Sequence, residues 1–149
     1  MRRWVRTATE ADLQVLRDLY RDHHLQPVAD KFFLEKIKRE EIMIALEDQN
    51  MRGYVILDKT SILELPYIQE PIMYKNEEHE GFDTKLMNTV EAYLKNLGYR
   101  KVITSCAVSN GRAIMRNKNN GYEEAGKLQG LRRDNNEEMI MIKTLEREE

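Results

Sequence analysis

The sequence has few of the residues that form disulfides or bind metal ions, and it lacks a long apolar segment that could span a membrane. It has one cysteine, Cys106, so no intramolecular disulfide can form, and we expect a cytosolic protein in which this thiol is buried and inert. Of the three histidines, two are adjacent and one is remote, which is not the spacing of a metal site, and we expect no metal. No apolar run approaches the roughly 20 residues of a membrane-spanning helix, so we expect no membrane partner.

A marked excess of charge of either sign is also missing. The 24 Lys and Arg residues nearly balance the 26 Asp and Glu residues, for a formal net charge of -2. A general nucleic-acid binder needs a clustered excess of positive charge, so nucleic acid is not an expected partner. Charged residues make up 34% of the chain and are interspersed with apolar ones, which favours an ordinary core under a solvated surface. A length of 149 residues fits one domain, 1–149.

The most informative stretch is Val102 to Gly126, in which a strand, a short helix and a second strand follow one another. Val102 to Val108 is mostly apolar and partly β-branched, with Thr104 and Ser105 as its only polar insertions, which is typical of a strand buried on both faces. Asn110 can cap a short helix that ends at the breaker Asn119-Asn120-Gly121, and Tyr122 begins the next strand.

This order of residues resembles the second half of the GNAT superfamily, the acyl-CoA N-acyltransferases. Asn110, Ala113, Gly121 and Tyr122 stand on the matching positions, between an apolar strand and a terminal hairpin. The resemblance implies an α/β (α+β) fold, with a mixed, mostly antiparallel sheet of about seven strands and about four helices. One position departs from the family, which often has a tyrosine there to protonate the thiolate of coenzyme A; this chain has Asn117.

Two helices are predicted near the N-terminus. Thr9 and Asp12 form a start that resembles a capping box, with Asp in place of the usual Glu. The core-facing stripe of the first helix is Leu13, Leu16, Leu19 and Tyr20. Pro27 suits the first turn of a second helix that continues to about Arg39. Its apolar face is predicted at Phe33, Leu34 and Ile37.

Further strands are predicted at Ile42 to Leu46, Tyr54 to Leu57, Ile62 to Ile68 and Met139 to Leu145. The first two are separated by the polar segment Glu47 to Gly53 and predict an antiparallel hairpin. Pro66 provides no N–H group for a sheet, so its strand needs an edge or a bulge. The resemblance implies that this strand splays from Val102 to Val108, which leaves backbone groups near Ile68 to bind the pantetheine arm of the cosubstrate.

A helix predicted from Thr84 to Leu97, with Gly98 as its stop, follows a polar loop. The N-terminus of a helix attracts phosphate, and the resemblance implies that the pyrophosphate of acetyl-CoA binds there. The family's loop motif is Gln/Arg-x-x-Gly-x-Gly/Ala, and its best register here is Glu78 to Asp83. Only Gly81 matches, because Glu78 stands at the Gln/Arg position and Asp83 stands where the family has a small residue. Asp83 can be an ordinary N-cap that would compete with a phosphate and repel it, but Gly81 and the helix start favour a working phosphate site. The implied cofactor-binding residues are Ile68, Gly81, Phe82, Asp83, Thr84, Asn110 and Ala113.

Acetyl transfer to an amine needs a base, a polarised thioester carbonyl and a proton for the thiolate. Glu64 and Glu70 lie on or just after the proline-containing strand, where the family often has its base, although each can equally be a solvent-facing residue. A backbone N–H near Ile68 would polarise the carbonyl. Asn117 cannot donate a proton as a phenol can.

The resemblance therefore implies an N-acetyltransferase that uses acetyl-CoA as cosubstrate and a small-molecule or peptide primary amine as acceptor. The altered phosphate loop and Asn117 favour an alternative, a GNAT-like binding or regulatory module without transferase chemistry. The identity of the acceptor and the oligomeric state stay open.

Overall fold

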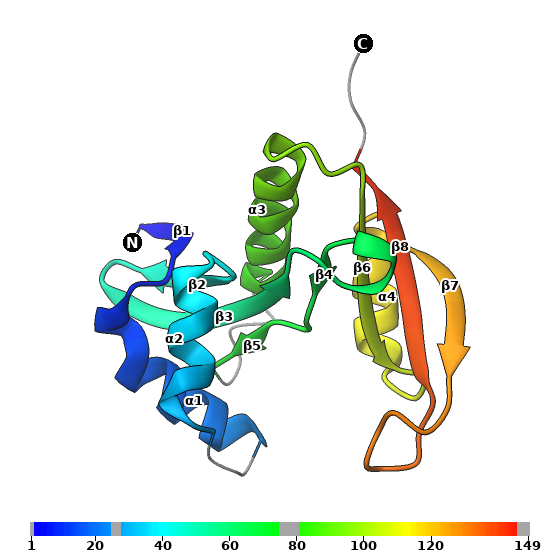
Figure 1. Cartoon of the computed structure of the whole chain (residues 1–149), viewed down its shortest axis with the longest axis horizontal. Helices are drawn as coiled ribbons and strands as arrows, with labels where there is room; N and C mark the ends of the chain where they lie inside the picture. Colours follow the sequence, from blue (N-terminus) through cyan, green and yellow to red (C-terminus); the bar gives the residue numbers. More distant parts are fainter. Residues whose placement is uncertain (1, 25–27, 75–80, 146–149) are drawn as a thin grey trace. The chain divides into compact units, whose positions relative to one another are not determined.

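The computed structural model describes residues 2–24, 28–74 and 81–145 of the chain (Figure 1). These residues form two compact units, one from Met1–Leu57 and Pro71–Val90 and the other from Asp58–Glu70 and Glu91–Glu149. Within the described ranges the chain forms four α-helices and eight strands, and the fold is of the predicted α+β class. No helix within the described ranges is long and apolar enough to cross a membrane.

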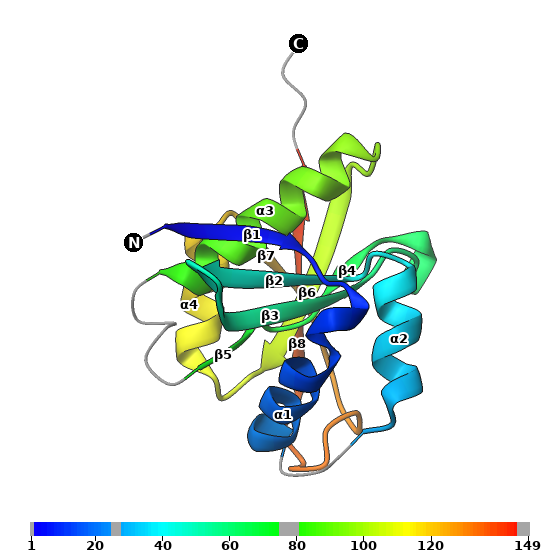
Figure 2. The same cartoon turned by 90° about the vertical axis from the view of Figure 1, so that its left-hand side faces the viewer.

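The first unit contains an antiparallel group of strands. Its members are β1 (Arg3–Thr7), β2 (Ile42–Glu47), β3 (Asn50–Asp58) and β5 (Ile72–Met73). β1 pairs with β2, β2 with β3, and β3 with β5 (Figure 2). The predicted hairpin is confirmed, but its turn is shorter than predicted, because β3 already begins at Asn50. Asp48 has φ 57, a left-handed conformation that allows the chain to reverse within a tight turn.

Two helices belong to the same unit, α1 (Leu13–His24) and α2 (Asp30–Lys38). The capping box is confirmed: the Thr9 N–H donates to Asp12 Oδ2 at 2.7 Å, at the start of the short 3-10 turn η1 (Glu10–Asp12) that leads into α1. The Arg6 guanidinium also binds both oxygens of Asp12, at 2.9 and 3.0 Å. The first turn predicted at Pro27 lies outside the described residues.

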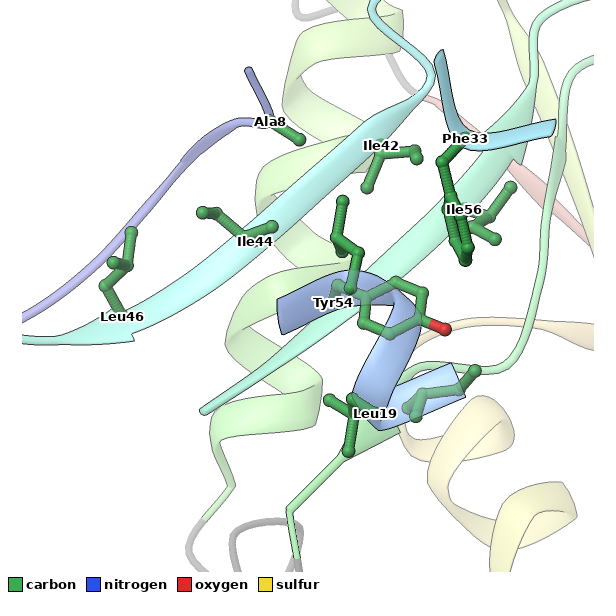
Figure 3. Packing of buried hydrophobic residues seen from close by; sticks show 10 residues of the cluster. Ala8, Leu19, Phe33, Ile42, Ile44, Leu46, Tyr54 and Ile56 are labelled. Carbon is green, nitrogen blue, oxygen red and sulfur yellow. The ribbon is translucent and has the colours of Figure 1, made fainter. Parts of the chain in front are cut away.

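Apolar residues of α1 and α2 form the core of this unit together with β2 and β3. The fully buried members include Leu16, Phe33, Ile42, Ile44 and Tyr54, of which Figure 3 labels the last four. Burying each such side chain contributes about 2 kcal/mol. The predicted stripe of α1 is confirmed, since Leu13 and Tyr20 pack on this core beside the buried Leu16 and Leu19. Leu34 is instead 36% exposed, because it follows Phe33 by about 100° around the helix and cannot face the same side.

Helix α3 (Phe82–Asn96) was predicted from Thr84 to Leu97 and begins two residues earlier. Leu86, Val90 and Leu94 are fully buried, as the predicted stripe requires. Leu97 was wrongly placed on that stripe: it follows the last helical residue and is 53% exposed. Gly98, with φ 100, ends the helix as predicted.

The second unit contains a mixed group of strands in the order β4-β6-β8-β7. They are β4 (Tyr67–Ile68), β6 (Lys101–Ala107), β7 (Glu123–Leu128) and β8 (Glu138–Thr144), and helix α4 (Gly111–Asn119) connects β6 to β7. β6 lies between parallel β4 and antiparallel β8 (Figure 1), so its predicted interior position is confirmed. Antiparallel pairing of β7 with β8 confirms the terminal hairpin.

The predicted strand from Ile62 to Ile68 is wrong over its first part. Ile62–Glu64 forms a 3-10 turn, η2, and only Tyr67–Ile68 is a strand. Leu63 and Glu64 have φ 56 and 63, a left-handed conformation that no strand can contain. The alternation of apolar residues predicted a strand here because it carries no information about these two dihedral angles.

Candidate functional site

The parallel ladder between β4 and β6 ends after two residue pairs, Tyr67 with Ile103 and Ile68 with Thr104. β6 continues to Ala107, whereas the chain after Ile68 turns away at Gln69-Glu70-Pro71. In the described part of the chain, the β4-facing edge of β6 therefore has no strand partner beyond Thr104. The Ile68 carbonyl is already used, since it accepts a hydrogen bond from Thr104 Oγ1 at 2.7 Å. Such a divergence offers backbone groups to an extended ligand.

A cleft of about 660 Å³ lies on one face of the second unit. Its apolar lining is Ile62, Ile103, Leu128, Leu131 and Ile140, and its polar lining is Asp58, Ser61, Tyr67, Ser105, Arg132, Arg133, Asp134 and Glu138. Alternate residues of a strand face the same side, which explains why Ile103 and Ser105 line the cleft and Thr104 does not. The volume is that of a small-molecule site.

Two hydroxyl groups meet in this cleft across β4 and β6. Tyr67 Oη and Ser105 Oγ are 2.7 Å apart and share a hydrogen bond. Burial raises the pKa of Tyr67, and the charges of Glu138, Asp58 and Glu70 raise it further, although the bond from Ser105 opposes them. The phenol therefore stays protonated at neutral pH.

Arg132, in the connection between β7 and β8, binds two of the carboxylates that line the cleft. Its Nε and Nη2 donate to the two carboxylate oxygens of Asp134, both at 3.0 Å, and its Nη1 donates to Glu138 Oε1 at 2.8 Å. The bond from Arg132 lowers the pKa of Asp134 to about 2, so this carboxylate is ionised. With three carboxylates and two guanidinium groups in its lining, the cleft has one excess negative charge.

The two glutamates predicted as candidate bases do not line this cleft. Glu64 is exposed on the η2 turn, and Glu70 is exposed on the segment between β4 and β5. The sequence had pointed to neither Tyr67 nor Glu138, because no local pattern marks a strand residue that faces a cleft. Ser105 was visible only as a polar insertion in an apolar strand.

Helix α4 positions the remaining residues predicted in this unit. Asn110 Oδ1 accepts the Ala113 N–H at 3.1 Å and is the predicted N-cap. Asn117 is fully buried; its Nδ2 lies 3.7 Å from Met141 Sδ, and its Oδ1 has no hydrogen-bond partner among the described residues. Cys106 is buried, as predicted, and burial raises the pKa of its thiol to about 11, so the thiol is protonated at neutral pH.

In the first unit, the start of α3 is the predicted phosphate site. Gly81 is exposed with φ 79, and no atom of the described residues beyond its chain neighbours lies within 4 Å of where its Cβ would be. Phe82 is buried under the Arg3 guanidinium, 5.0 Å from its ring centre. The Lys85 ammonium donates to the Arg3 carbonyl at 3.1 Å, which adds a second cation to this region.

Asp83 lies inside the first turn of α3, so its prediction as the N-cap is wrong. Its buried carboxylate accepts the Thr84 N–H at 2.8 Å. A phosphate would have to bind earlier in the turn or replace this bond. Gly81 and the helix start thus fit a pyrophosphate, while Asp83 opposes it. The preceding motif positions Glu78, His79 and Glu80 lie outside the described residues.

Comparison with known proteins points to one family. The profile described as "Acetyltransferase (GNAT) domain" matches residues 5–142. An acetyltransferase of the GNAT family from Bacillus cereus superposes with a TM-score of 0.86 at 18% identity, covering 99% of this chain and 100% of that chain. A proposed acetyltransferase from Salmonella typhimurium, solved with its cofactor acetyl-CoA, has a TM-score of 0.84 at 12% identity and coverages of 100% and 97%.

The ribosomal-protein-S18-alanine N-acetyltransferase from Escherichia coli is also similar, with a TM-score of 0.82 at 16% identity and coverages of 99% and 97%. No match was found among curated proteins.

Proposed function

Because this chain belongs to the GNAT acetyltransferase family, we propose that it transfers an acetyl group from acetyl-CoA to a primary amine. The observation that carries the proposal is the ladder between β4 and β6, which ends at Ile68 and Thr104 beside a cleft large enough for an acceptor. The divergence offers a slot for the extended pantetheine arm, and the cleft offers a place for the amine.

Membership of the family suggests which residues would hold parts of acetyl-CoA. In the first unit, the N–H groups of Gly81, Phe82, Asp83 and Thr84 at the start of α3 would bind the pyrophosphate. In the second unit, backbone groups beside Ile68 and along β6 would bind the pantetheine. Asn110 and Ala113 would fix the start of α4. When bound, acetyl-CoA supplies the activated acetyl group.

The lining of the cleft favours an amine with an apolar body. Ile103 and Ile140 on neighbouring strands provide an apolar surface, and the excess negative charge of the cleft attracts an ammonium group. The acceptor is a small-molecule or peptide amine.

A binding module without transferase activity is the second candidate. It is favoured by the buried Asp83 carboxylate on the Thr84 N–H and by Asn117, which has no proton to give to a thiolate.

Calorimetric titration with acetyl-CoA, followed by thiol release over alkylamines, arylalkylamines, amino acids, polyamines and peptides, separates the two. Binding with turnover of an amine supports the transferase, and binding without turnover supports the module. No binding would refute the transferase.

Asp83→Asn tests the phosphate site within the same experiment. The amide oxygen can still accept the Thr84 N–H, whereas the charge is removed. Relief of a repulsion of about 1 kcal/mol corresponds to roughly fivefold tighter binding of acetyl-CoA. Asp22→Asn, at an exposed position of α1, is the matched control and should leave the affinity unchanged. Equal affinities of the two variants for acetyl-CoA would refute the placement of the pyrophosphate at the start of α3.

A further inference from the structure

We infer that Tyr67 and Ser105 form the proton relay of the reaction, in which the phenol gives its proton to the leaving sulfur and Ser105 passes back a proton from the attacking amine. The inference rests on the proposed acetyl transfer. It deepens that function by assigning the proton chemistry, for which the family-like positions in this chain provide no competent group.

The position of the pair is the first argument. Tyr67 belongs to the β4–β6 ladder, and Ser105 is the first β6 residue beyond its end. Their 2.7 Å hydrogen bond therefore spans the point at which the two strands part. Both side chains line the cleft, so the bond also lies where an acceptor amine would enter.

The lack of an alternative donor is the second argument. Asn117 is fully buried and has no titratable proton. The carboxylates in the cleft lining are of a type that is ordinarily ionised at neutral pH, and a guanidinium does not release its proton. Among the described residues of the cleft lining, only the hydroxyl groups can supply a proton, and Tyr67 is the most acidic type among them.

The relay balances atoms and protons. The amine nitrogen attacks the thioester carbon, a C–N bond forms, and the C–S bond breaks. The Tyr67 hydroxyl gives its proton to the sulfur, which leaves as a thiol. The nitrogen must lose one proton to become an amide, and this proton passes to Ser105 Oγ while the Ser105 hydroxyl proton returns to the Tyr67 oxygen. The relay starts from the neutral amine, so an acceptor that enters as an ammonium ion first gives one proton to solvent water. From the neutral amine onward no net proton is consumed, and neither Glu64 nor Glu70 is needed as a base within the relay.

The environment of the phenol keeps it in the protonated form that the first step requires. Burial above all, with a smaller contribution from the charges of Glu138, Asp58 and Glu70, holds the pKa of Tyr67 above its ordinary value, although the hydrogen bond with Ser105 lowers it. A phenolate in this cleft is therefore costly, and it must regain a proton as soon as it forms. Ser105, already hydrogen-bonded to it, is placed to supply that proton.

The test compares Tyr67→Phe and Ser105→Ala with the wild type, using the amine that the panel identifies. Tyr67→Phe keeps the ring and should lower kcat about 100-fold or more, the usual worth of general acid catalysis, with an unchanged acetyl-CoA Kd and Tm. Ser105→Ala should lower kcat at least about tenfold. Because the two groups act as one unit, the double variant should be no slower than Tyr67→Phe alone.

Tyr93→Phe is the matched control, since this tyrosine lies in the same unit and is not part of the cleft lining. It should keep the wild-type kcat. A Tyr67→Phe enzyme that binds acetyl-CoA and keeps kcat within about twofold of wild type would overturn the relay and leave the transferase standing. Multiplicative losses in the double variant would also overturn it. A wild-type protein without turnover of any amine would refute the proposed function, and the relay with it.

Discussion

Removing one hydroxyl from the second unit should have a large effect on stability. Tyr122 is 2% exposed and donates to Glu91 Oε2 at 2.8 Å. The other oxygen of Glu91 accepts the Lys143 ammonium at 2.7 Å, and the Glu91 side chain is only 7% exposed. Burial and the charge of Glu91 raise the pKa of Tyr122, so the phenol remains a donor throughout the neutral range.

Tyr122→Phe keeps the buried ring and leaves one carboxylate oxygen without its donor. A hydrogen bond to a charged group contributes about 1.5–3 kcal/mol, and leaving a buried acceptor unsatisfied costs about as much. We expect the free energy of unfolding to fall by about 2 kcal/mol. For a chain of this size, that corresponds to a decrease in Tm of roughly 4–8 °C.

Urea unfolding followed by circular dichroism measures this loss. Tyr74→Phe, at a position 36% exposed, is the control and should change stability by less than about 0.5 kcal/mol. In a Glu91→Gln background the cost of Tyr122→Phe should shrink, because a neutral amide is cheaper to leave unpaired than a carboxylate. A Tyr122→Phe protein within about 0.5 kcal/mol of wild type would refute the reasoning, since Glu91 would then find water or another donor at no cost.

Three further substitutions follow from individual contacts. Tyr54→Phe should raise stability by about 1 kcal/mol in urea unfolding, because the Tyr54 hydroxyl is fully buried and has no partner among the described residues; a loss of stability would reveal an unseen partner. Gly53→Ala should lower stability by about 1–3 kcal/mol, because the new Cβ would lie 2.8 Å from the Ile72 carbonyl oxygen; an unchanged urea midpoint would contradict this. Asp12→Asn should lower stability by about 1 kcal/mol at pH 7, because burial raises the pKa of Asp12 but the bonds from Arg6 and Thr9 together lower it below its ordinary 3.8. That deficit should be constant above about pH 5 and shrink as the pH falls through the folded-state pKa, and a deficit independent of pH would refute the assignment.

The elements that could be predicted are those fixed by interactions between residues that lie close together in the sequence. Asn110 caps α4, and Gly121 ends it, through contacts that span three to five residues. The capping box at Thr9 and Asp12 is equally local. These signals predicted the helix and strand order of residues 102–126 and, through it, the family.

The wrong predictions concern residues whose conformation or burial depends on contacts with segments distant in the sequence. Apolar alternation at Ile62 to Ile68 predicted one strand, yet β6 pairs with only the last two of these residues, and a left-handed turn takes the first three. Periodicity likewise placed Leu34 and Leu97 on apolar faces, although burial depends on what packs against each position.

The candidate site follows the same rule. The sequence by itself determined the family-like positions, including the replacement of a proton donor by Asn117 and the carboxylate of Asp83 in the phosphate loop. Only the tertiary structure brought Tyr67 to Ser105, which are 38 residues apart, and placed Arg132 between two carboxylates in one cleft. A hydrogen bond between strands depends on register and on which face of the sheet each residue occupies, and both are fixed by pairing with distant segments of the chain.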